Sequence, residues 1–146
     1  MKFHHYGLLT KNLNKTILVF RRRSYIKISN IIECKFQNVK LIFFKKKNSK
    51  YFIELVDCTN NSQLKKFFEK KIKKKKNKLY FKYHKCYYVK NLDSTSKKLQ
   101  KNLYYKSLET IGESAIFKKI VFLKRKNSDI FLELVSKIKI KYRFLR

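Results

Sequence analysis

The chain of 146 residues is long enough for one domain with a modest hydrophobic core. Lysine and arginine number 39 against 9 aspartate and glutamate, which gives a formal net charge of +30 and predicts a polyanionic partner, since such a charge repels itself. Hydrophobic residues make up 44% of the chain and aromatic residues 16%, so the composition excludes a merely solvated basic tail and favours a folded domain embedded in nucleic acid.

The composition also indicates where the chain is encoded. It contains no proline or tryptophan and only 2 glycines, residues that need G- or C-rich codons, while lysine, asparagine, isoleucine, phenylalanine and tyrosine are abundant. Such A+T-rich coding is common in mitochondrial and plastid genomes. The 3 cysteines lie far apart, and an odd number suits a reducing compartment. We therefore expect a mitochondrial location, with a plastid-type organelle as the alternative.

The N-terminal part is basic throughout. Met1–Lys15 is expected to form an extended arm, and Thr16–Phe20 and Tyr25–Ile32 are expected to be strands. Between these two strands lie Arg21, Arg22 and Arg23, which form either a turn that grips phosphate or a solvated bend. The net charge favours contact with RNA.

The next two strands are predicted more strongly. Val39–Phe44 and Tyr51–Asp57 are apolar runs joined by the basic segment Lys45–Lys50, in the manner of a hairpin. This pattern predicts an N-terminal pair of hairpin strands within the sheet.

A lysine-rich segment, Ser62–Lys78, follows the hairpin. Its first part suits a short amphipathic helix capped by Ser62, whereas Lys70–Lys78 has little to bury and would repel itself. We interpret the segment as an insertion whose second part orders on RNA. Two β pieces, Lys78–Tyr83 and Tyr87–Val89, are expected next.

A long helix is expected after the loop Asn91–Ser96. The helix runs to Ala115, because apolar residues from Leu99 to Ile111 recur on one helical stripe.

The last quarter of the chain predicts a right-handed βαβ unit. Lys119–Leu123 is a strand, Lys124–Asn127 a basic turn and Ser128 a helix N-cap. Apolar residues then follow at helical spacing (Phe131, Leu134, Val135 and Ile138), with Asp129 and Glu133 in the first half, where the helix dipole favours anions. The alternation of Ile140–Phe144 predicts a final strand. The basic turn would then be a phosphate site at a helix N-terminus.

Residues with catalytic or metal-binding potential are few. His84 and Cys86 could be two metal ligands with His4 and His5 as remote candidates, but without paired spacing we expect single buried or surface residues and no metal. Two glycines exclude a glycine-rich phosphate loop, and no nucleophile has a supporting base. We therefore expect no catalysis, no cofactor and no small-molecule substrate. No apolar run is long enough to span a bilayer.

The candidate RNA-binding residues are the lysines, arginines and asparagines of the basic turns and the insertion. They are Arg21, Arg22, Arg23, Lys45, Lys46, Lys47, Asn48, Lys73, Lys74, Lys75, Lys76, Lys124, Arg125, Lys126 and Asn127.

The predicted order of elements resembles the small-subunit ribosomal protein eleven family over roughly Asn38 to Leu145. Leu41–Phe44, Lys45–Asn48 and Tyr51–Asp57 match that family's first strand, basic turn and second strand. Its long helix resembles Ser96–Ala115. The strand and basic turn that follow it resemble Lys119–Leu123 and Lys124–Ser128, without the family's glycines. The large-subunit ribosomal protein eighteen family has the same order of elements and is the closest competitor.

The sequence thus predicts an α/β fold: a mixed β-sheet with N-terminal hairpin strands, a long helix and a C-terminal βαβ unit. Residues 1–37 would form a basic extension and residues 38–146 a single RNA-binding domain with the insertion at about 62–78. The resemblance implies a structural protein of a mitochondrial matrix ribosome, on the platform of the small subunit, with ribosomal RNA and neighbouring ribosomal proteins as partners. The alternatives are a large-subunit protein and a basic accessory subunit of a mitochondrial membrane complex.

Overall fold

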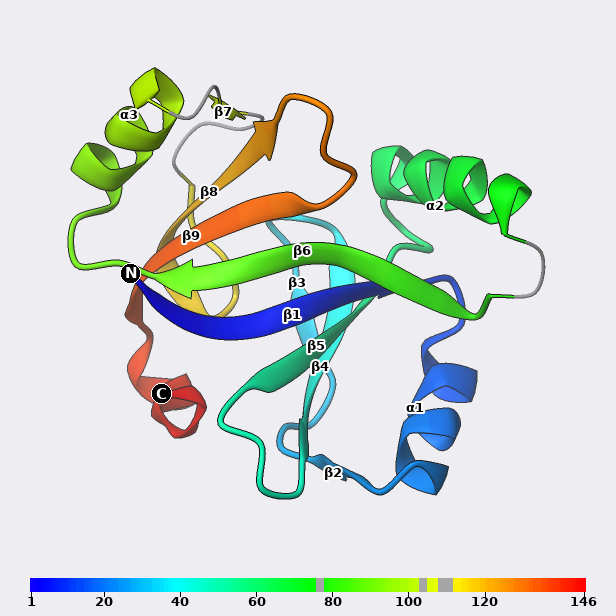
Figure 1. Ribbon diagram of the computed structural model, residues 1–146. Helices are drawn as coiled ribbons and strands as arrows, with labels where there is room; N and C mark the ends of the chain where they lie inside the picture. The colour runs from blue at the N-terminus through cyan, green and yellow to red at the C-terminus, as the bar shows by residue number, and fades with distance from the viewer. Residues whose placement is uncertain (76–77, 103–104, 108–111) are drawn as a thin grey trace. The chain divides into compact units, whose positions relative to one another are not determined.

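The computed structural model describes residues 1–75, 78–102, 105–107 and 112–146 (Figure 1). The fold is α/β with a mixed β-sheet, as predicted. The elements in chain order are β1 (Lys2–Thr10), α1 (Leu13–Arg22), β2 (Tyr25–Lys27), β3 (Ile32–Cys34), β4 (Val39–Lys46), β5 (Phe52–Asp57), α2 (Ser62–Lys74), β6 (Tyr80–Tyr88), α3 (Leu92–Asn102), β7 (Tyr105–Ser107), β8 (Phe117–Arg125), β9 (Phe131–Ile138) and the short 3-10 helix η1 (Ile140–Leu145). None of the described helices is both long and apolar enough to cross a membrane.

The chain divides into two compact units. Unit 1 comprises Met1–Tyr6 and Tyr83–Arg146, and unit 2 comprises Gly7–Lys82. The element order repeats along the chain: a strand, a helix, one or two short strands and two long strands occur first as β1 to β5 and again as β6 to β9, with α2 between the repeats. The boundary predicted at residue 37 falls within unit 2.

Unit 2 contains the predicted hairpin. Strands β4 and β5 pair antiparallel from Lys40↔Asp57 to Lys45↔Phe52, which confirms this prediction. Both short strands, β2 and β3, pair with β4. The core of the unit is a cluster of aliphatic and phenylalanine side chains: Leu8, Leu13, Phe20, Ile42, Phe44 and Leu55.

The predicted arm and first strand of unit 2 are wrong. β1 replaces most of the arm, and Thr16–Phe20 lies within helix α1. The Asn12 side chain accepts a hydrogen bond from the Lys15 amide and so caps this helix. Burial of Leu13, Thr16 and Phe20 follows the helical period, because the helix places only one stripe of this β-branched run in the core.

The lysine-rich insertion is helical where it is described. Asn61 caps α2 by accepting from the Leu64 amide, one residue before the predicted cap Ser62. Phe68 is buried and stacks on Phe81 with ring centroids 5.0 Å apart. This aromatic contact offsets charge repulsion among the lysines of α2, which ends at Lys74. Residues 76–77 of the predicted insertion lie outside the described residues.

Unit 1 is built around a parallel strand pair. β6 runs unbroken from Tyr80 to Tyr88 and pairs with β9 from His84↔Phe131 to Tyr88↔Val135, where two separate β pieces were predicted. β9 also pairs antiparallel with β8, the predicted strand at Lys119–Leu123. Within this unit the strands therefore follow the order β1, β6, β9, β8, β7 (Figure 1).

The predicted long helix is wrong. Helix α3 begins at Leu92 and ends at Asn102. Asn91 caps it, because the Asn91 side chain accepts a hydrogen bond from the Ser94 amide. Residues 105–107, which were expected inside the helix, form strand β7 against β8. The remaining part of the prediction falls partly on residues 103–104 and 108–111, outside the described residues.

The predicted C-terminal βαβ unit is also wrong. β8 and β9 form a hairpin whose turn has Asn127 at a φ of 64°, a left-handed conformation that asparagine adopts more readily than most residues. Four consecutive residues, Glu133 to Ser136, are buried, so β9 is covered on both faces. A strand covered on both faces loses its polar alternation, which is why its apolar residues matched a helical spacing. The predicted last strand is the 3-10 helix η1.

Candidate metal centre

Three strands of unit 1 bring together two histidines and a glutamate. His5 lies on β1, His84 on β6 and Glu133 on β9, and these strands are neighbours in the sheet. The His5 Nε2 and His84 Nε2 atoms are 3.0 Å apart. The Glu133 Oε2 atom lies 3.4 Å from the first and 3.2 Å from the second. We call these three residues the HHE cluster.

The HHE cluster is closed off from solvent. His5, His84 and Glu133 are 0%, 2% and 5% exposed. The Phe122 ring meets the His84 ring edge to face, with centroids 5.5 Å apart, and thereby holds its orientation. A carboxylate in such surroundings needs a compensating positive charge or strong hydrogen bonds.

The charge state of Glu133 is set by its neighbours. Burial alone would raise the pKa of this carboxyl, but the adjacent His84 ring, together with His5, lowers the pKa well below its ordinary value. Glu133 is therefore an anion at neutral pH. Its Oε2 atom is buried and makes no hydrogen bond within the described part of the chain.

The spacing of the three donor atoms fits a metal ion. For bonds of about 2.1 Å, neighbouring donors are separated by about 3.0 Å in octahedral and about 3.4 Å in tetrahedral coordination. The three separations of 3.0, 3.2 and 3.4 Å span this range. Two imidazoles and one carboxylate form a donor set that suits zinc, iron, cobalt or nickel.

A second group of potential ligands shares His5. His4, His5 and Cys86 place one donor atom each within 4.8 Å of one another, and all three are buried. In this group the two histidines approach through their Nδ1 atoms, which are 2.7 Å apart, a hydrogen-bonding distance. The contact therefore joins two rings to each other, whereas the Nε2 atom of His5 points to the HHE cluster.

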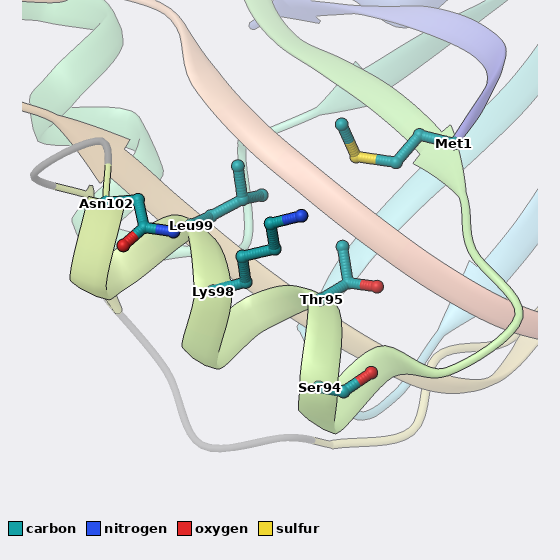
Figure 2. Close-up of a pocket in the computed structure, with 6 residues that line it drawn as sticks. All are labelled: Met1, Ser94, Thr95, Lys98, Leu99 and Asn102. Carbon is teal, nitrogen blue, oxygen red and sulfur yellow. The ribbon is translucent and has the colours of Figure 1, made fainter.

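Unit 1 also carries a surface pocket of about 450 Å³. Helix α3 lines it with Ser94, Thr95, Lys98, Leu99 and Asn102, and Met1 lies across from the helix (Figure 2). Among the described residues that line it, Lys98 is the charged side chain, and none is a histidine, cysteine or carboxylate. The pocket therefore offers space and a positive charge, while the groups capable of chemistry are in the HHE cluster.

The candidate RNA-binding residues lie in four places. Arg21 and Arg22 end helix α1, and Arg23 follows as its C-cap. Tyr25, two residues later, pairs with Lys46. The arginines therefore lie at the same end of the β2–β4 pair as the turn after β4. This turn contains Lys47 and Asn48, after Lys45 and Lys46 at the end of β4. The lysines at 73–75 end α2, and Lys76 is outside the described residues. Lys124 and Arg125 end strand β8, and Lys126 and Asn127 lie in the β8–β9 turn of unit 1.

The role of these basic residues stays a prediction. For the β8–β9 turn, however, one argument is lost, because no helix follows the turn and no helix N-terminus faces a phosphate there. Lys124 instead lies over the Phe131 ring, with its Nζ atom 5.7 Å from the ring centroid.

Sequence reasoning considered the histidines but set them aside. It assigned Glu133 to the first turns of a helix, which separated it from His84. A usable signal was present: the chain has only 3 histidines, and Glu133 follows His84 at the same spacing of 49 residues at which the buried Glu54 of β5 follows His5. This repeated spacing matches the repeated order of elements.

Comparison with known proteins identifies the fold. No family model and no curated protein matches the sequence. Solved structures do match: methylmalonyl-CoA epimerase in complex with methylmalonyl-CoA and ammonium has a TM-score of 0.72 at 17% identity, over 93% of this chain and 94% of that one. The Mycobacterium tuberculosis methylmalonyl-CoA epimerase has a TM-score of 0.70 at 16% identity, over 92% and 87%. A hypothetical protein of Bacillus halodurans has a TM-score of 0.70 at 20% identity, over 94% and 95%.

These matches overturn the ribosomal interpretation. The resemblance to the two ribosomal protein families is wrong, because the fold is similar to that of methylmalonyl-CoA epimerase structures. The same finding contradicts the prediction of a ribosomal or membrane-complex subunit and that of ribosomal RNA and ribosomal proteins as partners. It also contradicts the expectations that the chain has no small-molecule substrate and is not an enzyme. The mitochondrial location, with a plastid-type organelle as its alternative, stays a prediction.

Proposed function

We propose that the chain is a metal-dependent enzyme that acts on a small carbonyl compound, with the HHE cluster as its metal site. The observation that carries the proposal is the set of donor separations among His5, His84 and Glu133, 3.0 to 3.4 Å, between three buried side chains. The fold, similar to that of methylmalonyl-CoA epimerases, supports an enzyme of this kind.

Each residue of the cluster has a distinct part. His5 and His84 present Nε2 atoms as neutral donors, and Glu133 supplies the negative charge that a buried divalent cation needs. Three protein donors would leave further coordination positions of a divalent cation for oxygen atoms of a substrate. A divalent cation held by these three residues would supply Lewis-acid chemistry, polarising a carbonyl oxygen and so acidifying the neighbouring C–H bond.

The fold neighbours suggest the first substrate class to test. Two of these epimerase structures are complexes with methylmalonyl-CoA and with 2-nitronate-propionyl-CoA, both acyl derivatives of coenzyme A. We therefore propose as the substrate an acyl-CoA or related thioester whose carbon next to the carbonyl exchanges its proton with solvent.

Metal binding is the decisive experiment. The full chain, stripped with a chelator, is dialysed against Zn²⁺, Co²⁺ or Mn²⁺, and the bound metal is counted by elemental mass spectrometry. We expect one ion per chain. For His84→Gln and Glu133→Gln we expect a loss of metal affinity larger than the 10–100-fold loss typical of substituting a residue that hydrogen-bonds to a ligand. Glu113→Gln is the matched control, because Glu113 is a half-exposed carboxylate of the same unit that pairs with Lys139. The absence of stoichiometric metal, or equal binding by all variants, would overturn the metal site.

The activity is tested by solvent exchange. Methylmalonyl-CoA is incubated in deuterium oxide with the metal-loaded protein, and the proton next to the carbonyl is followed by NMR. We expect metal-dependent loss of this signal, suppressed by a chelator and by Glu133→Gln. Stoichiometric metal without exchange on any acyl-CoA tested would retain the site and reject this substrate class.

A further inference from the structure

A chain of hydrogen bonds leads from the HHE cluster to the C-terminal segment of unit 1. His4 Nδ1 lies 2.7 Å from His5 Nδ1, and the rings meet at 79° with centroids 5.0 Å apart. The other ring nitrogen of His4, Nε2, contacts the backbone carbonyl oxygen of Leu145. The three groups are buried: His4 is 7% exposed, and His5 and Leu145 are 0% exposed.

The carbonyl at the end of this chain determines where the protons lie. A carbonyl oxygen only accepts, so His4 must carry a proton on Nε2. A neutral His4 then has a lone pair on Nδ1 and accepts a hydrogen bond from the Nδ1–H group of His5. His5 is left with its lone pair on Nε2, the atom that lies 3.0 Å from His84 Nε2. This is the tautomer that binds a metal through Nε2.

We propose that His4 is a positioning residue that, together with the Leu145 carbonyl, fixes His5 in its metal-binding tautomer and orientation. This inference rests on the proposed function, because it assigns a supporting role beside the HHE cluster. Histidines that bind metals commonly donate their second ring N–H to an acceptor, which fixes the ring and increases its basicity as a ligand.

The packing around His4 keeps the chain of hydrogen bonds in place. Phe117 meets the His4 ring edge to face, with centroids 5.4 Å apart. The segment that ends in Leu145 is anchored at its start by Lys139, whose amide donates to the Ile116 carbonyl at 2.9 Å and whose Nζ donates to the Ser114 carbonyl at 2.7 Å. Helix η1 therefore presents the Leu145 carbonyl from a fixed position, and the C-terminal segment becomes part of the site.

Two substitutions of His4 separate hydrogen bonding from packing. His4→Phe retains a buried ring but can neither accept nor donate, whereas the amide of His4→Gln can accept from His5 and donate to Leu145. Zn²⁺ affinity is measured on the full chain by competition with a chelator. We expect the Zn²⁺ affinity of His4→Phe to fall about 10–100-fold, the range typical of residues that hydrogen-bond to a metal ligand. We expect His4→Gln to retain most of the affinity. Equal affinity of His4→Phe and the parent chain would overturn the role of His4.

A second measurement reads the proton positions directly and does not depend on the variants or on metal. Long-range ¹⁵N–¹H NMR spectra of the metal-free parent chain distinguish the two neutral tautomers of each histidine. We expect His5 protonated on Nδ1 and His4 protonated on Nε2. His5 protonated on Nε2 would overturn the inference even if zinc binds.

Cys86→Ser distinguishes a failure of the inference from a failure of the proposed site. Cys86 belongs to the alternative group with His4 and His5. We expect Cys86→Ser to bind Zn²⁺ like the parent chain and the Co²⁺-loaded parent to lack a sulfur-to-metal charge-transfer band. Loss of binding in Cys86→Ser, or appearance of that band, would make His4 a ligand and overturn both the HHE site and the positioning role. Unchanged metal binding in His4→Phe would reject only the latter.

Discussion

Glu133→Gln should remove the stabilisation that a bound metal gives to the protein. A ligand at 100 times its dissociation constant stabilises the folded state by about 2.7 kcal/mol. For a chain near this size, 1 kcal/mol shifts the melting temperature by about 2–4 °C, so the parent chain should gain about 5–11 °C. The glutamine keeps the shape of the side chain and one oxygen donor but lacks the negative charge that Glu133 carries in its buried site. The gain should therefore nearly vanish.

The assay compares melting curves, followed by circular dichroism, with Zn²⁺ at a fixed excess and with a chelator. The difference between the two conditions is taken for each variant, which cancels any effect of the substitution on the metal-free protein. Glu113→Gln serves as the control, since this half-exposed carboxylate pairs with Lys139, and should show the full gain. A gain of the same size in Glu133→Gln and the parent chain would refute the assignment of Glu133 as a ligand.

Three further predictions concern the fold. Leu134 is 0% exposed within a cluster of apolar side chains, so Leu134→Ala should cost about 2–5 kcal/mol in urea unfolding, and a cost below about 1 kcal/mol would mean that β9 is not buried as described. Asn127 has a φ of 64°, so Asn127→Gly should be tolerated while Asn127→Val should cost about 1–2 kcal/mol; the reverse order would contradict the hairpin. Burial, and to a smaller extent the charge of Asp57, raises the pKa of the Cys58 thiol to about 11. At pH 8 this thiol should therefore react with a disulfide reagent far more slowly than a free thiol does. Rapid labelling of Cys58 in the folded protein would disprove its burial.

Local patterns predicted some elements because the signal and its cause lie in the same segment. The β4–β5 hairpin follows from two apolar runs and a short basic turn, and its register confirms them. The first turns of α2 follow from the amphipathic spacing near a cap, although the cap is Asn61. Helix α1 was missed because its β-branched residues favour a strand, and only packing of Leu13 and Phe20 in the core of unit 2 overrides that preference.

The sequence by itself determined the mixed α/β class, the β4–β5 hairpin and strand β8, whereas the histidines were considered as ligands and set aside. Its charge was misleading as a guide to function, because net charge reports on solubility and nonspecific binding, and says little about the chemistry of a site. Only the tertiary structure decided that residues 131–138 form a strand, since burial on both faces removes the alternation that distinguishes strand from helix. The HHE cluster depends on the same decision. Its donors come from three strands far apart in the chain, and non-local strand pairing brings His5, His84 and Glu133 within 3.4 Å of one another.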